Sequence, residues 1–348
     1  MRPKYLLIAL VGTLLGCESV VAQQSAGYES SRIYDGDRPI HLSLWYPTDQ
    51  KESPVNYGIG AGSAATGAKP VGDRLPIVLL SHGAMGAASN YSWIAESLAR
   101  HRYVVLGVSH FGESPVFGAQ SINPATVARF RDRTHDLNVA LDWLLTKSRF
   151  AGAVDASRIG ALGHSSGGAT ALMLAGARFS FTQMSEYCAS GTAKVDKGCW
   201  YGTPSADTAE RQVPEPASRP IRAVVALDPA VGPGFIEDSL RNLKSALLVA
   251  GSIENDFLSY QAHAGRIAKA KADAEVVRLD RGEGHFVYID TCAANINVMG
   301  ISLCTDRAGV DRAAVHARLG AVIVEFLSKQ LANSAVQGAL PDKAAQRP

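Results

Sequence analysis

The sequence predicts an α/β domain in which a mostly parallel sheet is flanked by helices. Short, fully apolar runs, typical of buried parallel strands, alternate along the chain with longer segments of helical pattern. One such run, 158–162, leads through a Gly- and Ser-rich turn into the Ala- and Leu-rich segment 169–177. With 348 residues, 47% of them hydrophobic and 19% charged, the chain can bury a large core.

The elements are expected in a simple order. A β-hairpin over 28–46 turns at Asp35-Gly36-Asp37, and the Pro-, Gly-, Ala- and Ser-rich stretch 47–74 is expected to be a long loop. Further strands are expected at 77–80, 103–108, 158–162, 223–227, 246–250 and 275–279, and helices at 89–100, 128–147, 169–177, 260–272 and 310–331.

A single domain is expected over 23–333, because the chain shows no repeat and no second core. Residues 178–220 contain four prolines and little periodicity, which indicates a loop or lid inserted after the helix at 169–177. Residues 334–348 are expected to be a disordered tail.

Residues 1–22 are expected to be a secretory signal peptide. Basic residues at positions 2 and 4 precede a short apolar stretch over 5–15, and Ala22 ends a small-residue cleavage site. The apolar stretch is too short to cross a bilayer, so no transmembrane span is expected. Leu14-Leu15-Gly16-Cys17 also resembles a bacterial lipobox, which would instead place a lipid on Cys17. The mature protein is expected to be exported, either periplasmic or secreted, with a Cys17-anchored lipoprotein as the alternative.

Cysteine usage agrees with export. Beyond the signal peptide the chain has Cys188, Cys199, Cys292 and Cys304, and an even count in an oxidising compartment suggests two disulfides. Local pairing, first with second and third with fourth, closes two short loops, each contributing roughly 2–4 kcal/mol. Four free thiols are the alternative. No cysteine or histidine spacing suggests a metal, and a net charge of +2 without basic runs indicates no nucleic-acid partner.

The segment Gly163-His164-Ser165-Ser166-Gly167 has the pattern G-x-S-x-G between a predicted strand and a predicted helix. In this arrangement the serine takes a strained backbone conformation, and glycines on both sides let neighbouring backbone pass closely. The turn exposes the hydroxyl above a helix N-terminus, where free N–H groups favour a developing negative charge. Ser165 is therefore the candidate nucleophile, and a chance Gly/Ser turn is the alternative.

A serine hydroxyl is a weak nucleophile, so it needs a base within hydrogen-bond reach and an acid that orients the base. His285 follows the last predicted strand in a Gly-rich turn and is the expected base. His164 is expected to point away from Ser165 and to pack, and His110 to line the pocket.

Two aspartates are candidates for the acid. Asp228 ends the strand 223–227, and Asp256 follows the strand 246–250, so both satisfy the chain order serine, acid, histidine. The later position favours Asp256, although its loop is longer than the common form and Glu254 is close. Asp256 is the first choice, and Asp228 remains open.

The oxyanion hole needs two backbone N–H groups that face the reacting carbonyl oxygen. Ser166, directly after the nucleophile, is expected to supply one. Ala84, in the loop after the buried strand 77–80, is expected to supply the other.

Four segments occur in the order found in a known family: Leu80-Ser81-His82-Gly83, the elbow extended to Thr170, Ala226-Leu227-Asp228 and Gly284-His285-Phe286. Over roughly residues 30–330 the chain resembles the α/β-hydrolases of the plasma-type platelet-activating-factor acetylhydrolase and dienelactone-hydrolase-like group. The resemblance implies an α/β-hydrolase fold and cleavage of carboxylic esters without a cofactor. It implies Asp228 as the acid in plasma-type acetylhydrolases, and Asp256 in exported bacterial relatives and the similar polyester-hydrolysing cutinases.

Other features refine the resemblance. The paired late cysteines before Asp311, Arg312 and His316 look like the exported bacterial branch. Dienelactone hydrolases proper use a cysteine nucleophile, so Ser165 argues against their substrate.

The predicted function is hydrolysis of small or short-acyl carboxylic esters through an acyl-enzyme. Polyester or phospholipid hydrolysis by the same triad is the alternative, so the expected partner is a small-molecule or lipid-like ester. A peptidase is disfavoured because no added domain would gate peptides. A non-catalytic binding protein of this fold would usually have lost a triad residue, and none is missing here.

Overall fold

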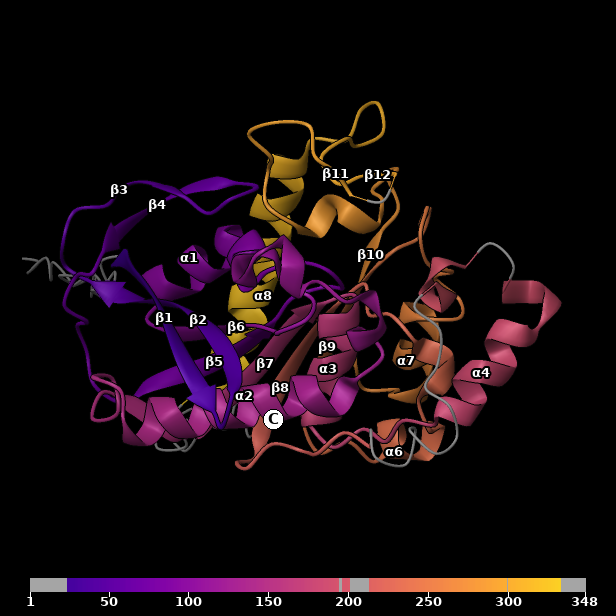
Figure 1. Ribbon diagram of the computed structural model, residues 1–348, viewed down its shortest axis with the longest axis horizontal. Coiled ribbons are helices and arrows are strands. Elements are labelled where there is room, and N and C mark those ends of the chain that lie inside the picture. Colours follow the sequence, from indigo (N-terminus) through magenta and orange to yellow (C-terminus); the bar gives the residue numbers. More distant parts are fainter. Residues whose placement is uncertain (1–23, 194–195, 201–212, 299, 333–348) are drawn as a thin grey trace, which may run out of the picture.

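The structure is a computed structural model that describes residues 24–193, 196–200, 213–298 and 300–332 (Figure 1). The predicted signal peptide, the predicted tail at 334–348 and part of the predicted insertion lie outside the described residues.

In the described residues ten strands form one sheet, in the order β10-β9-β8-β7-β5-β6-β2-β1-β4-β3. Their bounds are β1 Ser25–Asp35, β2 Arg38–Thr48, β3 Ser53–Asn56, β4 Ala61–Thr66, β5 Leu75–Ser81, β6 Val104–Ser109, β7 Val154–His164, β8 Ile221–Leu227, β9 Ala246–Ser252 and β10 Glu275–Leu279. Strands β5 to β10 run parallel, and β1 and β2 form the predicted antiparallel hairpin. The mostly parallel sheet and its opening hairpin are therefore confirmed.

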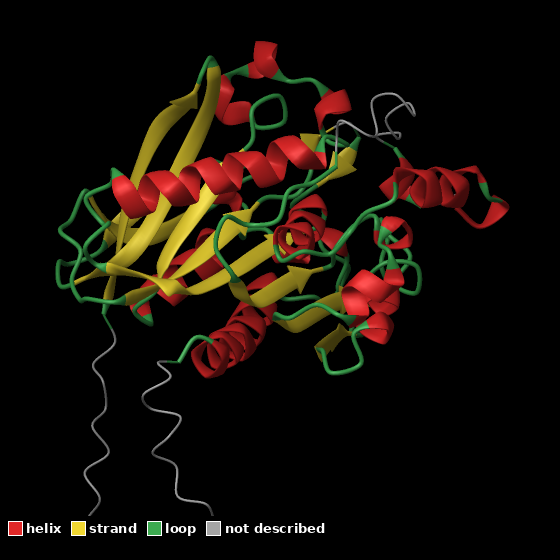
Figure 2. Ribbon diagram, turned by 90° about the horizontal axis from the view of Figure 1, so that it is seen from below, coloured by secondary structure: helices red, strands yellow, loops and turns green. Residues whose placement is uncertain are grey.

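Helices cover both faces of the sheet (Figure 2). α1 (Ser92–Arg100) and α8 (Arg312–Gln330) share one core layer, whereas α2 (Phe130–Thr146), α3 (Ser166–Leu174), α6 (Glu237–Arg241) and α7 (Ala264–Ala270) belong to the other. In β5, Ile77 and Leu79 pack into one layer, and Val78 and Leu80 pack into the other. Because both faces are buried, the strand is apolar at every position instead of alternating.

The segment 47–74 is not the predicted long loop, because it contains β3 and β4. β4 pairs in parallel with β1, and β3 pairs with β4. The small residues of β4 have little strand propensity, but they let the strand approach α1 closely: a side chain at Gly62 would overlap Glu96. The Glu96 carboxylate also accepts the Ser63 N–H at 2.9 Å, which fixes the strand against the helix.

The insertion after α3 contains a helix, α4 (Phe181–Ala189), where a loop or lid was expected. In Figure 1 α4 lies at the far right of the molecule, away from the sheet. α6 was not predicted either, since a five-residue helix shows too few repeats of the helical period to be recognised.

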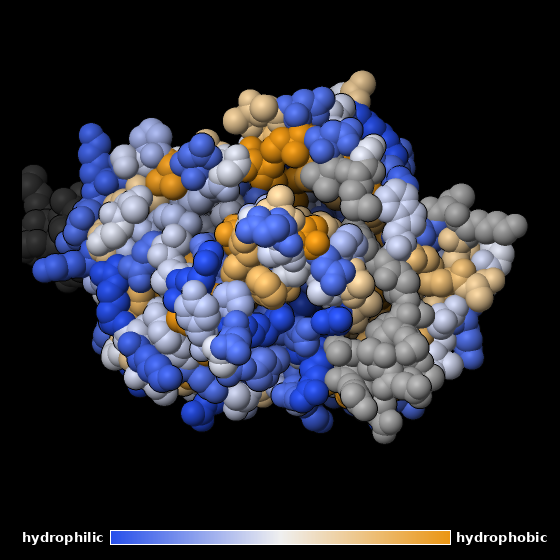
Figure 3. Space-filling view, viewed as in Figure 1, coloured by the Kyte–Doolittle hydropathy of each residue, from blue (hydrophilic) through white to orange (hydrophobic). Residues whose placement is uncertain are grey.

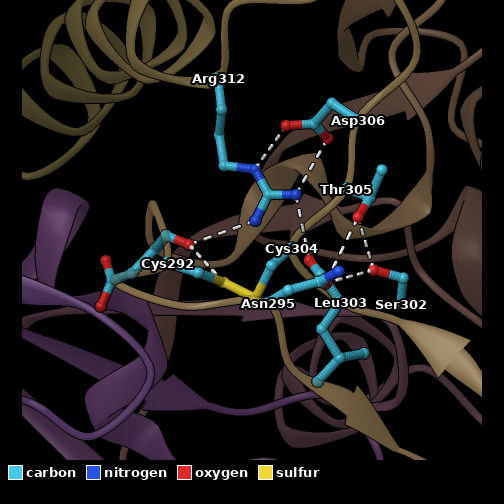
Figure 4. The surroundings of a disulfide bond; sticks show 9 residues. Cys292, Asn295, Ser302, Leu303, Cys304, Thr305, Asp306 and Arg312 are labelled. Atoms are coloured by element: carbon cyan, nitrogen blue, oxygen red, sulfur yellow. Dashed lines mark hydrogen bonds and ion pairs between the residues drawn. A yellow bond between two sulfur atoms is a disulfide. The ribbon is translucent and has the colours of Figure 1, made fainter.

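Both predicted disulfide pairs are present and the pairing is confirmed. Cys188 bonds to Cys199 in the insertion, and Cys292 bonds to Cys304 in the loop before α8. Around the second pair, Arg312 donates to both carboxylate oxygens of Asp306, at 2.8 and 2.9 Å, and to the Leu303 carbonyl at 3.0 Å (Figure 4). This loop, which includes the short strands β11 (Asn297–Val298) and β12 (Ile301–Ser302), is thus tied to the start of α8.

Among the described helices, none combines the length and the apolarity that a membrane span requires.

Candidate active site

Ser165 lies at the tight turn between β7 and α3. Its φ of 55° and ψ of −122° are a conformation that residues with a side chain rarely adopt. A Cβ on Gly163 would overlap the Gly167 carbonyl, and one on Gly167 would overlap the Ser81 carbonyl, so both glycines are required by close backbone contacts. The Ser165 N–H donates to the Leu227 carbonyl at 2.9 Å, which fastens the turn to β8.

The His285 imidazole is held by the Asp228 carboxylate. The distance from His285 Nδ1 to Asp228 Oδ2 is 2.6 Å, and both side chains are almost fully buried. The Ser252 N–H donates to Asp228 Oδ1 at 3.2 Å, and the Asn255 amide donates to Oδ2. The carboxylate is therefore fixed from two further sides and can hold the Nδ1–H tautomer of the ring.

Asp256, the first choice from sequence, contacts a different part of the same residue. Its carboxylate accepts the backbone N–H of His285 at 3.1 Å. Glu254 is exposed and lies 3.9 Å from Arg307. Of the two aspartates left open by the sequence, only Asp228 contacts the imidazole.

His164 connects the nucleophile turn to the loops on either side of it, so it does more than pack. Burial and the neighbouring His285 hold the pKa of His164 well below its ordinary value, so the ring is neutral at pH 7. Its Nε2–H donates to the His285 carbonyl at 2.9 Å, and its Nδ1 accepts the Tyr91 hydroxyl at 3.0 Å. The Tyr91 oxygen in turn accepts the Gly83 N–H at 2.9 Å. One hydrogen-bonded chain thus joins the loop after β5, the turn at Ser165 and the loop that carries His285.

The backbone N–H groups of Ala84 and Ser166 remain available at the site. In the described part of the chain neither N–H donates to a protein acceptor. Both residues line the same small cavity as Ser165, and Ser166 is the first residue of α3. An oxyanion hole requires two such free N–H groups beside the nucleophile, so Ala84 and Ser166 remain the candidates.

Two cavities meet at Ser165 and Ala84. The smaller, of about 40 Å³, extends toward the insertion and is lined mainly by apolar side chains, among them Phe130, Phe179, Phe181 and Met184. The larger, of about 540 Å³, is lined by both His164 and His285. His285 therefore lies on the side of the larger cavity.

The larger cavity has an apolar rim. Its lining includes Ile59, Phe286, Ile289, Ile296, Ile301 and Leu303, together with Trp200, which is 51% exposed. Figure 3 shows apolar surface at the top of this face, where Figure 1 places β11 and β12, and again near its centre. The disulfide-braced loop of Figure 4 thus forms part of the cavity wall.

His110 does not line either cavity, contrary to the expectation from sequence. It is buried between Asp136, at 2.9 Å from its Nδ1, and Ser81, at 3.0 Å from its Nε2. Arg133 lies beside this group, donates to Ser81 Oγ at 3.0 Å and to the His82 carbonyl at 2.9 Å, and pairs with buried Glu113. These contacts hold the start of the loop that carries Ala84.

Several residues of the site carry no local sequence signal. Tyr91 lies eight residues after Gly83 without a motif, and Asn255 is an ordinary loop residue. Phe257 stacks on the His285 ring with centroids 4.8 Å apart, but only the fold brings the two together. Among the described residues no group of three or more histidine, cysteine or acidic side chains could hold a metal ion.

The strand order, the tight turn at Ser165 after β7 and the position of His285 after β10 define an α/β-hydrolase fold. A sequence family described as platelet-activating factor acetylhydrolase, isoform II, matches residues 61–129. Cutinase est1 from Thermobifida alba is 32% identical over 103 residues, which are 29% of this chain and 30% of that protein. A platelet-activating factor acetylhydrolase from Cavia porcellus is 24% identical over 216 residues, 45% of this chain and 49% of that protein.

A solved structure of a ferulic acid esterase from Streptomyces cinnamoneus has the same fold. It aligns with a TM-score of 0.54 and 18% identity over 95% of this chain and 94% of that chain. The chain has the α/β-hydrolase fold, and the predicted fold is confirmed. The sequence alignments span less than half the length of these cutinase and acetylhydrolase relatives.

Proposed function

We propose that this protein hydrolyses carboxylic esters with Ser165 as nucleophile, His285 as base and Asp228 as the orienting acid. The 2.6 Å contact between Asp228 and His285 Nδ1 carries the proposal, because it leaves Nε2 free to accept a proton. The strained turn at Ser165 and the cavities that meet there support it. The cutinase and acetylhydrolase relatives support the same reaction class.

Acylation begins when Ser165 Oγ attacks the ester carbonyl carbon and His285 Nε2 takes the hydroxyl proton. The carbonyl oxygen becomes negatively charged and is held by the N–H groups of Ala84 and Ser166. Losing one such donor typically costs about 10²–10³ in kcat. Collapse of the tetrahedral intermediate breaks the bond to the alcohol oxygen, which takes the proton from His285.

Deacylation repeats the same steps with water. His285 removes a proton from the water, whose oxygen attacks the acyl carbon bound to Ser165. The intermediate collapses, the proton returns to Ser165 Oγ, and the carboxylic acid leaves. No cofactor is needed for either step.

The two cavities suggest which part of the ester each accepts. His285 must protonate the leaving alcohol, so the alcohol belongs in the larger cavity that His285 lines. The acyl chain then enters the smaller cavity beside Ser166, where about 40 Å³ favours a short chain. The preferred substrate is an ester of a short acid with a bulky, apolar alcohol.

Hydrolysis of a lipid or polyester is the second candidate. The observation that favours it is the apolar rim of the larger cavity, with Trp200 half exposed at its edge. Matched assays on short soluble esters, phospholipid vesicles and polyester film separate the two candidates, because only a lipid or polyester hydrolase is expected to prefer the insoluble substrates.

The test of the reaction class is the release of p-nitrophenol from p-nitrophenyl butyrate by purified protein. Wild type is expected to turn over, and Ser165→Ala to lose at least about 10³ of kcat. A fluorophosphonate probe is expected to label Ser165 in wild type and not in the variant. Wild-type activity equal to that of Ser165→Ala would contradict the proposal.

We also propose that the protein acts outside the cytoplasm, either in the periplasm or secreted. Its two disulfides fit an oxidising compartment. N-terminal sequencing of the exported protein is expected to begin at Gln23. A lipid-modified N-terminal Cys17 would instead establish the lipoprotein alternative.

A further inference from the structure

The smaller cavity contains one cation in an otherwise uncharged wall. Within the described part of the chain, Lys197 is the only charged residue among those that line it. Lys197 lies in the insertion, at the start of a short 3-10 turn over Lys197–Cys199. Lys197 is half-buried, and removing a charge from water is costly unless the charge is paired, so its surroundings are informative.

The Lys197 ammonium lies where the two cavities adjoin. Its Nζ is 5.4 Å from the centroid of the Trp200 ring and 5.5 Å from that of Phe257, and both rings line the larger cavity. Phe257 also stacks on His285, so the ammonium and the imidazole approach the same ring. No described carboxylate lies within ion-pair distance of it. The aromatic faces offer a cation weak attraction, and a full counter-charge would bind more strongly.

The backbone that carries Lys197 is fixed in several ways. Its N–H donates to the Phe257 carbonyl at 3.0 Å. The preceding Asp196 is buried, pairs with His263 at 2.8 Å and accepts the Tyr187 hydroxyl at 2.7 Å. The disulfide between Cys188 and Cys199 closes the same segment. Lys197 is therefore presented from a rigid turn, which lowers the entropy lost when a ligand binds.

We propose that Lys197 is a specificity-determining residue that selects acyl groups bearing a carboxylate. Half-esters of short dicarboxylic acids, such as succinate and glutarate, are then better substrates than the corresponding neutral diesters. This inference rests on the proposed function, because the acyl chain faces Lys197 only when its ester carbonyl lies at Ser165. The short acyl chain fits the smaller cavity, and its free carboxylate supplies the counter-charge that the described residues do not.

The test compares monomethyl glutarate with dimethyl glutarate, with methanol release as the readout. Wild type is expected to favour the half-ester in kcat/KM, and Lys197→Met to lower that preference about tenfold, as for one charge-assisted contact. Lys197→Arg keeps the charge and is expected to retain most of the preference. Lys329→Met is the matched control: it removes one positive charge from the exposed end of α8 and should leave the preference unchanged.

A second pair of esters tests the direction of binding. Acetoxyacetate has a free carboxylate on the alcohol side of its acetyl ester, and its methyl ester lacks that charge. Lys197→Met is expected to leave the ratio of their kcat/KM values for acetate release unchanged. The proposal is overturned if this variant keeps the wild-type preference for monomethyl glutarate, or if it alters only the alcohol-side pair.

Binding separates this inference from the proposed reaction. Calorimetric titration of monomethyl glutarate into Ser165→Ala protein is expected to show an affinity that falls about tenfold when Lys197→Met is added. Such a fall without any wild-type turnover would contradict the proposed function and leave the anion subsite intact. Equal affinity for both proteins would overturn the subsite.

Discussion

Replacing Asp228 with asparagine should reverse the hydrogen bond at His285 and inactivate the enzyme. The carboxylate accepts from His285 Nδ1 at 2.6 Å on one oxygen and from the Ser252 N–H at 3.2 Å on the other. The Asn255 amide donates to the same oxygen as His285, and an asparagine oxygen can satisfy the donors on only one side. If its oxygen faces Ser252, its NH₂ group faces Nδ1, the ring proton moves to Nε2, and the base can no longer accept from Ser165.

The size of this effect follows from the loss of the correct tautomer. The equivalent change in a Ser-His-Asp triad costs about 10⁴ in kcat, or about 5 kcal/mol of transition-state stabilisation. Asp228→Asn is therefore expected to lose about 10⁴ of kcat with p-nitrophenyl butyrate. A melting curve checks that the variant remains folded.

Asp256→Asn is the matched control. Among the described residues its carboxylate accepts only the His285 backbone N–H, at 3.1 Å, and an asparagine carbonyl can accept the same bond. We expect kcat within about threefold of wild type, less than 1 kcal/mol of barrier. An Asp256→Asn variant that loses orders of magnitude, beside an Asp228→Asn variant close to wild type, would refute the reasoning.

Three further predictions concern the groups around the proposed triad. Burial alone would raise the pKa of Glu113, but the charge and hydrogen bonds of Arg133 outweigh it and hold the pKa at about 2, below the ordinary 4.5. The unfolding free energy should therefore fall as pH drops from 4.5 toward 2. In urea titrations Glu113→Gln should flatten this pH dependence and lower the unfolding free energy by about 3–5 kcal/mol at neutral pH. Replacing Cys292 and Cys304 with serine should cost about 3 kcal/mol of stability and raise KM for bulky alcohols, whereas an unchanged KM would argue against the role of their loop in the cavity wall. Phe181→Ala should enlarge the smaller cavity and shift the best p-nitrophenyl ester toward longer acyl chains, by up to about 0.8 kcal/mol for each added methylene, and an unchanged chain-length profile would place the acyl group elsewhere.

Much of the fold could be predicted because the buried strands carry strong local signals. The apolar run at β5 and the Gly-rich turn around Ser165 are such signals, and both disulfide pairs follow from short sequence separations. β4 was missed because its pairing depends on backbone contacts and on a close approach to α1. Its small residues permit this approach, but they give no sequence pattern that predicts a strand.

The site was harder to predict where its geometry depends on residues distant in the chain. Asp228 and Asp256 both follow strands that end near His285, and spacing alone does not say which carboxylate meets the ring and which meets the backbone. The same holds for Arg133 and Glu113, which pair from a helix and a loop without any motif.

The hydrogen-bonded chain from Gly83 through Tyr91 and His164 to the His285 carbonyl has a consequence for thermal behaviour. It crosses three loops that follow separate strands, so a displacement of one loop strains the other two. The proposed catalytic groups should therefore form one cooperative unit. On heating, activity is expected to disappear in a single sharp transition, with the Gly83 and His285 backbone amides losing their protection against hydrogen exchange together.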